Sequence, residues 1–561
     1  MKKSILALLL ALAMVAGLAG CGGGSSQPSP EGATDGAATT QASGGDLRIM
    51  LETPVQSLDP QVATDGTSFE VIADYTDGLM QMAEDGQPVE AIAESYEISE
   101  DGKTYTFHLR DTNWSNGTPV TAADFVFAWQ RACDPELASE YSYMMSDIAQ
   151  IKNAAEIIAG EKDKSELGVT AVDDKTLQVE LNVPVSYFLS LMYFPTFYPV
   201  NEEFFNSVGI ETFGTSPDTV LSNGAFVMDD YQPAATAFHL TKNADYWDAG
   251  RVNLPGLAYQ VIQDSQQALM SYQAGDLDAT LINGDQVDQV AGDEAFKAIG
   301  AGYLWYISPN QNGKSANPAM KNVKIRKALT MAMDRETITT EILKDGSAPT
   351  YTAVPKDFAT GPDGSDFAED QTKYADVCSY NPEEAAKLWA EGLKEEGIDS
   401  LSLTMLVDDD DAPKKVAQVL KEQWETTLPG FTLELKTEPK KKRLDDMEND
   451  NYEIALTRWG PDYADPMTYL GMWITDNLNN YGFWSNADYD ALIADCTTGE
   501  ASTDPEARWA KLFEAEKIVM DEAVIFPIYT QCNAEMISPS VSGIEFHPVA
   551  LNRVYKNAQK K

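Results

Sequence analysis

The side chains best suited to hold a ligand follow a predicted strand at residues 452–459 of this 561-residue chain. Apolar and small residues alternate there with a period of two, and Gly460-Pro461 ends the strand because proline has no N–H for the ladder. The strand end carries an indole, a carboxylate and a phenol: Trp459, Asp462 and Tyr463. Ligands of α/β sheets bind beyond the carboxyl ends of strands. These residues are candidate ligand contacts, and the alternative is a loop in which Asp462 only caps a turn.

Motifs for covalent, acid–base or metal chemistry are absent from the sequence. It contains no GxSxG, SxxK or HExxH, and the histidines lack the spacing of metal ligands: His108, His239 and His547. Residues 313–315 resemble the end of a phosphate loop, but Ser308 stands where its first glycine is needed. We therefore expect no catalytic residues, metal or cofactor, and keep a surface hydrolase or adhesin as the alternative.

The strongly negative charge of the chain excludes nucleic acid as a partner. The formal net charge is −48 and the pI about 4.2, whereas binding to nucleic acid needs a basic surface. The acidic run at residues 408–411 lacks the glycine and spacing of a calcium loop. We interpret it as a solvated turn that places acid at the start of the next helix.

The first residues predict export and anchoring. Two lysines precede an apolar stretch at residues 5–18, which is too short to span a bilayer. It ends in Leu18-Ala19-Gly20-Cys21, which resembles a lipoprotein signal peptide (1–21) with Cys21 as the lipidated residue. Acyl chains such as palmitate on Cys21 would anchor the protein to the outer face of a bacterial cytoplasmic membrane, or within the periplasm. An ordinary secretory signal is the alternative. Residues 22–45, rich in Gly, Ser, Ala and Thr, are predicted to be a flexible tether.

Four further cysteines are widely spaced and form no CxxC motif: Cys133, Cys378, Cys496 and Cys532. One or two disulfides formed after export are one interpretation, and isolated buried thiols are the other.

The elements around the candidate residues predict an α/β layer. A strand at 401–407, a helix at 413–426 and a strand at 431–437 form a strand–helix–strand unit, beside which the strand at 452–459 is placed. Other predicted elements are a strand at 103–110, helices at 122–132, 323–332, 334–343 and 507–521, antiparallel pairs at 169–172/176–181 and 223–227/237–241, and strands at 46–51 and 524–529.

Six segments together resemble the extracellular solute-binding proteins of peptide- and nickel-importing ABC transporters, especially the oligopeptide-binding proteins. In chain order these segments, which span nearly all of the chain after the tether, are 93–110, 114–126, 222–226, 242–247, 324–335 and 452–466.

The resemblance implies an α/β, two-lobed periplasmic-binding-protein-like fold with a hinge and three structural domains. Domain I is expected to combine 46–65, 200–302 and 529–561. Domain II is expected to be an insertion at 66–199, and domain III to be 303–528, the second lobe. The lobes are expected to close around the ligand.

The resemblance also implies how a ligand is held. An oligopeptide is expected to lie extended between the lobes, with its α-ammonium at the position of Asp462. Arg458, Trp459 and Gly460 are expected beside it, other cleft positions match Trp305, Tyr141 and Phe194, and Glu52 or Thr53 is expected to contribute near the first strand. For the aromatic residues, a core role is the alternative.

The sequence differs from some relatives at positions that can bind the peptide carboxylate in those relatives. Met447 and Leu456 occupy positions that carry arginines in those relatives, and four nearby basic residues are possible substitutes: Lys440, Lys441, Lys442 and Arg443. Peptide length and side-chain preference therefore stay open, as do other solutes: a nickel chelate, an oligosaccharide or another small amine. The family implies partnership with an ABC permease and its ATPase, and we expect a monomer.

Overall fold

The computed structural model describes residues 44–83 and 86–561. The predicted signal peptide, Cys21 and all but the last two residues of the predicted tether lie outside the described residues.

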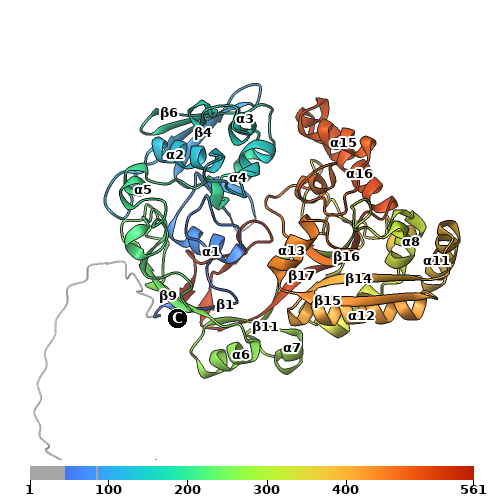
Figure 1. Cartoon of the computed structure of the whole chain (residues 1–561). Helices are drawn as coiled ribbons and strands as arrows, with labels where there is room; N and C mark the ends of the chain where they lie inside the picture. The colour runs from blue at the N-terminus through green and yellow to red at the C-terminus, as the bar shows by residue number, and fades with distance from the viewer. Residues whose placement is uncertain (1–43, 84–85) are drawn as a thin grey trace, which may run out of the picture. The chain divides into compact units, whose positions relative to one another are not determined.

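One long sheet runs through the described part of the chain and positions the candidate site. It holds eleven strands, in the order β15-β14-β16-β12-β17-β11-β1-β10-β9-β8, with β13 paired to β17. Its strands are β1 (Leu47–Leu51), β8 (Phe226–Asp230), β9 (Ala237–Lys242), β10 (Gly256–Val261), β11 (Ala279–Ile282), β12 (Phe296–Pro309), β13 (Ala348–Pro349), β14 (Leu401–Asp408), β15 (Phe431–Glu438), β16 (Ile454–Trp459) and β17 (Phe526–Ile537). Figure 1 shows β1 and β9 on one side of the molecule and β14 to β16 on the other.

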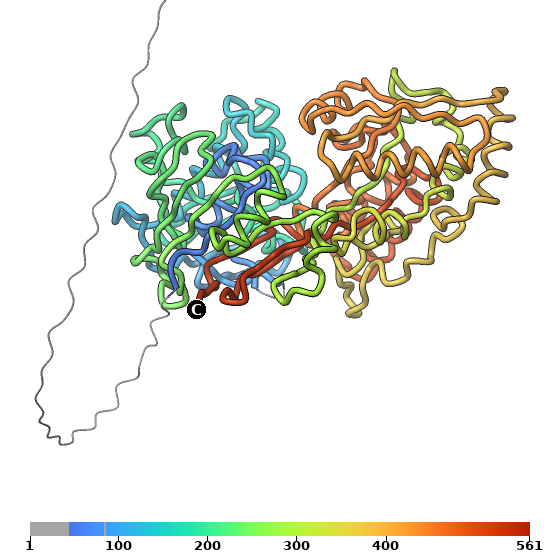
Figure 2. Tube along the Cα trace, turned by 90° about the horizontal axis from the view of Figure 1, so that it is seen from below, coloured from blue at the N-terminus to red at the C-terminus, as the bar shows by residue number. Residues whose placement is uncertain are grey.

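Two long antiparallel strands, β12 and β17, join these two sides. Their pairing shifts register between Gly300 and Leu304 and again between Trp305 and Tyr306. Such irregularities bend and twist a sheet locally. The expected domain boundaries at 302/303 and 528/529 fall inside these strands, so the chain crosses between the two sides within the sheet (Figure 2).

The predicted strand–helix–strand unit is confirmed. β14 and β15 pair in parallel from Leu401↔Phe431 to Asp408↔Glu438, and α12 (Asp411–Thr427) connects them. β16 lies beside β14, also in parallel, with Met405 opposite Ile454. α12 buries one apolar stripe, and this one-sided burial produces the helical periodicity seen in the sequence. The stripe consists of Val416, Ala417, Leu420 and Trp424.

The acidic run at 408–411 differs from its interpretation as a solvated turn. Asp409 and Asp410 are exposed, and Asp411 begins α12 as predicted. Asp408, however, is buried, and its Oδ1 lies 2.6 Å from Nε of Arg443. The first residue of the run is therefore part of a buried ion pair, because β14 extends one residue further than its apolar run.

Residues 66–199 build a separate sheet in the order β4-β5-β7-β6 together with a β2–β3 pair. The predicted hairpin at 169–181 and the helix at 122–132 are both present, the helix with a capping box between Thr121 and Asp124. The elements of this region are α1 (Gly66–Tyr75), β2 (Met80–Met82), β3 (Pro88–Glu90), β4 (Ala93–Ile98), β5 (Thr104–Leu109), α2 (Ala122–Cys133), α3 (Ala154–Ile158), β6 (Val169–Asp173), β7 (Thr176–Glu180) and α4 (Phe188–Leu191).

The remaining helices cover the long sheet and its neighbours. They are α5 (Glu202–Val208), α6 (Ser265–Ala274), α7 (Gly284–Val290), α8 (Val323–Met331), α9 (Arg335–Thr337), α10 (Ala375–Cys378), α11 (Pro382–Glu396), α13 (Lys440–Glu448), α14 (Met467–Leu470), α15 (Ala487–Thr497) and α16 (Pro505–Asp521). The helix predicted at 334–343 is confirmed only in part, because after α9 the chain widens into a π-helix at Ile338–Leu343.

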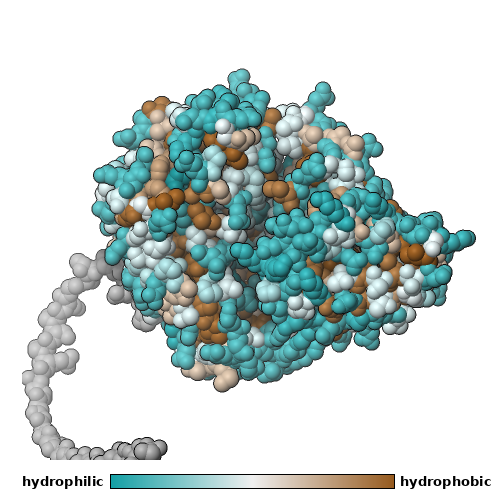
Figure 3. Space-filling view, in the orientation of Figure 1, coloured by the Kyte–Doolittle hydropathy of each residue, from teal (hydrophilic) through white to brown (hydrophobic). Residues whose placement is uncertain are grey.

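The visible surface of the protein is mainly hydrophilic. Hydrophilic residues cover most of the face seen in Figure 3, with hydrophobic residues in small separate groups. None of the described helices has both the length and the apolar character needed to cross a membrane.

The four described cysteines are free thiols, and three of them are buried. This supports the interpretation of the cysteines as isolated buried thiols.

Candidate functional site

Asp462 lies directly beyond β16, in the loop predicted from the sequence. It is half-buried, and its backbone N–H donates to Oγ1 of Thr468 at 3.1 Å. The hydroxyl of Tyr143 donates to Oδ2 of Asp462 at 3.0 Å, although the two residues are 319 positions apart in the chain. Burial raises the pKa of Asp462 to about 7, and the Tyr143 hydrogen bond opposes that rise. No described cation contributes to this pKa, so the ionised carboxylate lacks a countercharge.

Aromatic side chains surround this carboxylate. Tyr463 is buried and stacks on Tyr187, with ring centroids 4.7 Å apart. Tyr141 lies next to Tyr143, with centroids 5.6 Å apart, and is half-buried. Tyr141 therefore borders the carboxylate, whereas Tyr463 has the burial of a core residue that supports the loop.

Phe194 packs behind Tyr141 and does not reach the surface. The two rings stack with centroids 5.4 Å apart, and Phe69 meets Phe194 edge-on at 5.0 Å. Phe194 is 1% exposed. Its geometry fits the core alternative, as a wall that fixes Tyr141.

The end of β16 and the neighbouring β12 bring two predicted residues together. Trp305 pairs with Arg458 across the two strands. The Arg458 guanidinium lies 4.7 Å from the ring centroid of Tyr303 and 5.3 Å from that of Trp305. Trp305 Nε1 and Arg458 Nη1 both donate to Oε1 of Gln531, at 2.8 and 3.1 Å. This arrangement holds a cation next to two rings.

Trp459 and Gly460 continue the same wall. Trp459 is half-buried, and its Nε1 is buried with no partner among the described residues. A Cβ on Gly460 would lie 2.5 Å from a ring carbon of Tyr303, so only glycine allows this approach.

Glu52 and Thr53 follow the end of β1 and are exposed. Oγ1 of Thr53 lies 3.2 Å from Oγ1 of Thr67 at the start of α1. Glu52 is open to solvent, yet the protein around it raises the pKa of its carboxyl, and the Arg458 charge opposes that rise. The Arg458 charge thus acts on Glu52 although no ion pair joins the two residues in the described structure.

The basic residues near Arg458 have different roles. Arg443 is buried in its ion pair with Asp408 and also donates to Oγ1 of Thr457 at 2.8 Å. Lys442 forms an ion pair with Asp446. Met447 and Leu456 are themselves buried apolar residues and offer no charge to a carboxylate. Arg443 is therefore not a substitute for the arginines of some relatives.

Three residues of this region were missed by the sequence interpretation: Tyr143, Tyr303 and Gln531. Tyr303 precedes Trp305 by two positions in a strand and so shares its face, a signal that was available. Tyr143 and Gln531 come from distant segments and carry no local signal.

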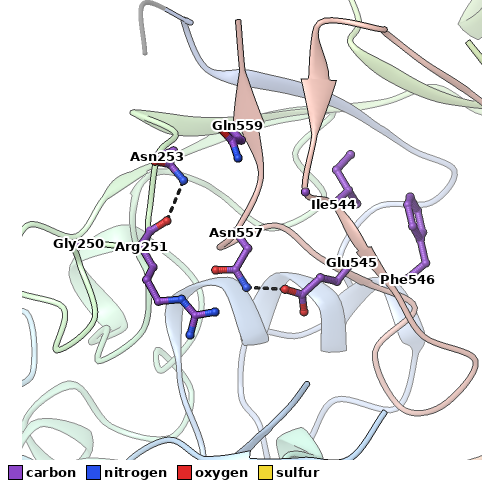
Figure 4. A pocket seen from close by; sticks show the side chains of 9 residues that line it. Gly250, Arg251, Asn253, Ile544, Glu545, Phe546, Asn557 and Gln559 are labelled. Carbon is purple, nitrogen blue, oxygen red and sulfur yellow. Dashed lines mark hydrogen bonds between the residues drawn. The ribbon is translucent and has the colours of Figure 1, made fainter. Parts of the chain in front are cut away.

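A separate surface cavity of about 690 Å³ lies between residues 250–253 and residues 543–546 and 557–559 near the C-terminus, and none of the predicted site residues lines it (Figure 4). Asn557 donates to Glu545 there, and Asn253 donates to the backbone oxygen of Arg251 at 2.9 Å. Among the described residues no group of three or more His, Cys, Asp and Glu side chains is arranged to hold a metal.

Comparison with known proteins identifies the family. Residues 87–481 match bacterial extracellular solute-binding proteins, family 5 (middle region). The chain is 33% identical to the dipeptide-binding protein of Lactococcus lactis subsp. cremoris over 526 residues, 92% of this chain and 94% of that protein. It is also 33% identical to the oligopeptide-binding protein OppA of Bacillus subtilis, over 97% of each chain. The solved structure of Listeria monocytogenes OppA bound to peptide gives a TM-score of 0.80 at 34% identity, covering 92% of this chain and 99% of that one.

The chain therefore belongs to the bacterial extracellular solute-binding proteins of family 5. The predicted α/β, two-lobed fold with an additional domain is confirmed by the match to the solved structures.

Proposed function

We propose that this protein captures oligopeptides in extended form between its two lobes and delivers them to the permease and ATPase of an ABC importer. The observation that carries the proposal is Asp462, a partly buried carboxylate that a tyrosine orients and no described cation neutralises. A buried charge needs a countercharge with good hydrogen-bond geometry, and a peptide α-ammonium supplies both. The names of the relatives, which refer to dipeptides, oligopeptides and bound peptide, support the same ligand class.

The proposed contacts fall into two groups. Asp462, with Tyr141 close by, receives the ammonium, while Arg458, Trp459, Gly460 and Trp305 form a wall along the peptide. Glu52 and Thr53 approach from the other lobe. Tyr463 and Phe194 stay in the proposal as supports of the loop and of Tyr141.

The domain assignment is part of the proposal, with domain I from 46–65, 200–302 and 529–561, domain II from 66–199, and domain III from 303–528. The Tyr143–Asp462 hydrogen bond then joins domain II to domain III. Contacts of this kind favour the closed arrangement of the lobes, which the ligand stabilises by its own contacts with both.

We further propose that the mature protein is a monomer, turns over no substrate, and is anchored through lipid on Cys21. The relatives are solute-binding proteins, which supports a binding role. Replacing Cys21→Ser is expected to leave uncleaved precursor or to release the protein from the membrane fraction. Recovery of a lipidated mature form from that variant would contradict the anchor.

The decisive experiment combines ligand identification with a double-mutant cycle. Mass spectrometry of what co-purifies after exposure to a mixed peptide pool is expected to show intact peptides; a nickel chelate or an oligosaccharide instead would identify another solute. Calorimetry then compares a captured peptide and its N-acetylated form on wild type and Asp462→Asn. Loss of either charge is expected to cost about 2–5 kcal/mol, and the two losses should not add. Equal affinity of wild type for both peptides would contradict the assignment of Asp462.

A further inference from the structure

The surface cavity near the C-terminus has the size of a ligand site (Figure 4). Its volume of about 690 Å³ lies within the range of about 300–1,000 Å³ that is usual for such sites. One wall is the loop at 250–253, and the other is formed by residues 543–546 and 557–559. All of these segments belong to the proposed domain I. The shape of the cavity therefore does not depend on closure of the lobes around a peptide.

The backbone holds both walls of this cavity in place. Two antiparallel pairs support the C-terminal wall: β18 (Val541–Ser542) with β21 (Gln559–Lys560), and β19 (Glu545–Phe546) with β20 (Arg553–Val554). Gly543 has a φ of +75°, and a Cβ there would lie 2.5 Å from the backbone oxygen of Asn557, so glycine is needed for this close approach. In the opposite wall Val252 is buried, and its backbone oxygen accepts from Nζ of Lys242 at 2.6 Å. A site that is already formed loses little conformational entropy on binding.

Several polar groups that line the cavity are not fully used by the fold. The Arg251 side chain is 63% exposed, and its ion pair with Asp248 is long, at 3.5 Å. Among the described residues no hydrogen bond holds the side-chain amide of Gln559. Asn557 donates its amide N–H to Glu545, which leaves its amide oxygen as an acceptor. The lining thus offers both donors and acceptors to a ligand.

The chemistry of the lining favours a neutral ligand with many hydroxyl groups. Arg251 and Glu545 are the charged residues that line the cavity, and their charges are opposite, so the lining carries no net charge. Planar guanidinium, carboxylate and amide groups can each bridge two neighbouring hydroxyls. Figure 4 shows the side chains of Ile544 and Phe546 together on one side, across from Arg251. Such an apolar side suits the C–H face of a sugar ring.

An acetamido group on the sugar matches the remaining features of the lining. It carries one N–H donor, one carbonyl acceptor and a methyl group. The amide of Gln559 can both donate to it and accept from it, and Ile544 offers an apolar contact for the methyl group. Proteins of this family are extracellular, where N-acetylated saccharides of the bacterial envelope are accessible.

We propose that this cavity is a second binding site, for saccharides that carry acetamido groups, and that it acts independently of the peptide cleft. The saccharide is either a soluble fragment or part of an insoluble glycan, since both present the same acetamido and hydroxyl groups. A receptor bound in this way stays next to a glycan while its cleft takes up peptides.

The test measures by calorimetry the binding of chitotriose, a trimer of N-acetylglucosamine, and of cellotriose, which has hydroxyls in place of the acetamido groups. Wild type is expected to bind chitotriose about 2- to 10-fold more tightly than cellotriose. Arg251→Ala removes a charged donor and is expected to weaken chitotriose binding about 10- to 100-fold, and Gln559→Ala to weaken it about 2- to 10-fold. Gln267→Ala is the matched control, because it changes an exposed glutamine of α6 outside the cavity, and it should bind as wild type does. Thermal unfolding reports whether each variant is folded.

A competition experiment separates this cavity from the peptide cleft. Wild type saturated with a captured peptide is expected to bind chitotriose as the free protein does, and Arg251→Ala is expected to keep wild-type affinity for that peptide. Co-sedimentation with insoluble chitin would identify a glycan as the source, and its absence together with chitotriose binding would identify soluble saccharides. Displacement of chitotriose by peptide would assign the sugar to the cleft and overturn the second site. Absence of chitotriose binding, equal affinity for the two trisaccharides, or unchanged affinity in both cavity variants would also overturn it. None of these results would contradict the proposed function, which is tested with peptides alone.

Discussion

Two aspartates in one loop, Asp462 and Asp465, have opposite electrostatic surroundings. Asp465 is buried and receives both Nη groups of Arg508 at 2.7 and 2.8 Å, an arrangement with two parallel charged hydrogen bonds. Asp462, three positions earlier, is half-buried and receives one neutral donor, the hydroxyl of Tyr143. Asp465 thus has its countercharge within the fold, whereas Asp462 has none among the described residues. The first holds the loop in place, and the second is free to bind.

The largest expected effect is on stability, from breaking the Asp465–Arg508 pair. Arg508→Leu leaves Asp465 buried without its countercharge and should lower the free energy of unfolding by about 3–5 kcal/mol. Urea denaturation with a constant m-value measures this. Asp462→Asn is the matched control, since it removes no ion pair, and it should not lower the free energy of unfolding. Equal destabilisation by both variants would show that the two aspartates do not differ in role.

The next effect is on the pH dependence of binding. The pKa of Asp462 is raised from 3.8 to about 7 by burial, whereas a bound ammonium favours the ionised carboxylate. Below about pH 7, binding must therefore release a proton, and affinity should fall by up to about tenfold per pH unit as the pH decreases. Calorimetry at pH 6 in buffers of different ionisation enthalpy should report close to one proton released. At pH 8 Asp462 should release almost none, and the peptide α-amino group, whose pKa is about 8, should instead take up part of a proton. Asp462→Asn should abolish the release at pH 6; its persistence would assign the proton to another group, such as Glu70, whose pKa burial also raises to about 7.

The raised pKa of Asp462 also determines how the stability of the ligand-free protein changes with pH. Because the folded-state pKa of Asp462 lies above the unfolded value of 3.8, the folded protein holds this proton more tightly. The resulting stabilisation is fully present below the unfolded pKa and is lost as the pH rises through about 7. We therefore compare the free energy of unfolding of Asp462→Asn with that of wild type at two pH values. The difference should favour the variant more at pH 8 than at pH 5.

The smallest expected effect comes from the neutral donor. Tyr143→Phe keeps the ring but removes the hydrogen bond to Asp462, which should weaken peptide binding by about 0.5–1.5 kcal/mol. Since that hydrogen bond lowers the pKa of Asp462, the midpoint of proton release should also move upward. Tyr141→Phe is the control, because the Tyr141 hydroxyl makes no hydrogen bond to Asp462 in the described structure. A larger loss in the control would show that Tyr141 is the more important residue.

Local patterns in the sequence were sufficient to predict the elements that position the site. The periodicity of residues 401–437 predicted β14, α12 and β15, and Gly460-Pro461 correctly marked the end of β16. These features depend on neighbours within a few positions, where propensity, capping and burial on one face decide the outcome. The placement of Asp462 just beyond a strand end was predictable for the same reason.

The partners of the charged residues were decided by the tertiary structure alone. Asp408 and Asp410 look alike in the sequence, yet one is buried on Arg443 and the other is exposed. Lys440 and Arg443 belong to one basic run, yet only Arg443 has its charge compensated within the fold. The electrostatic state of each group depends on which distant segment packs against it. Tyr143 reaches Asp462 from 319 residues away, and no local pattern encodes that distance.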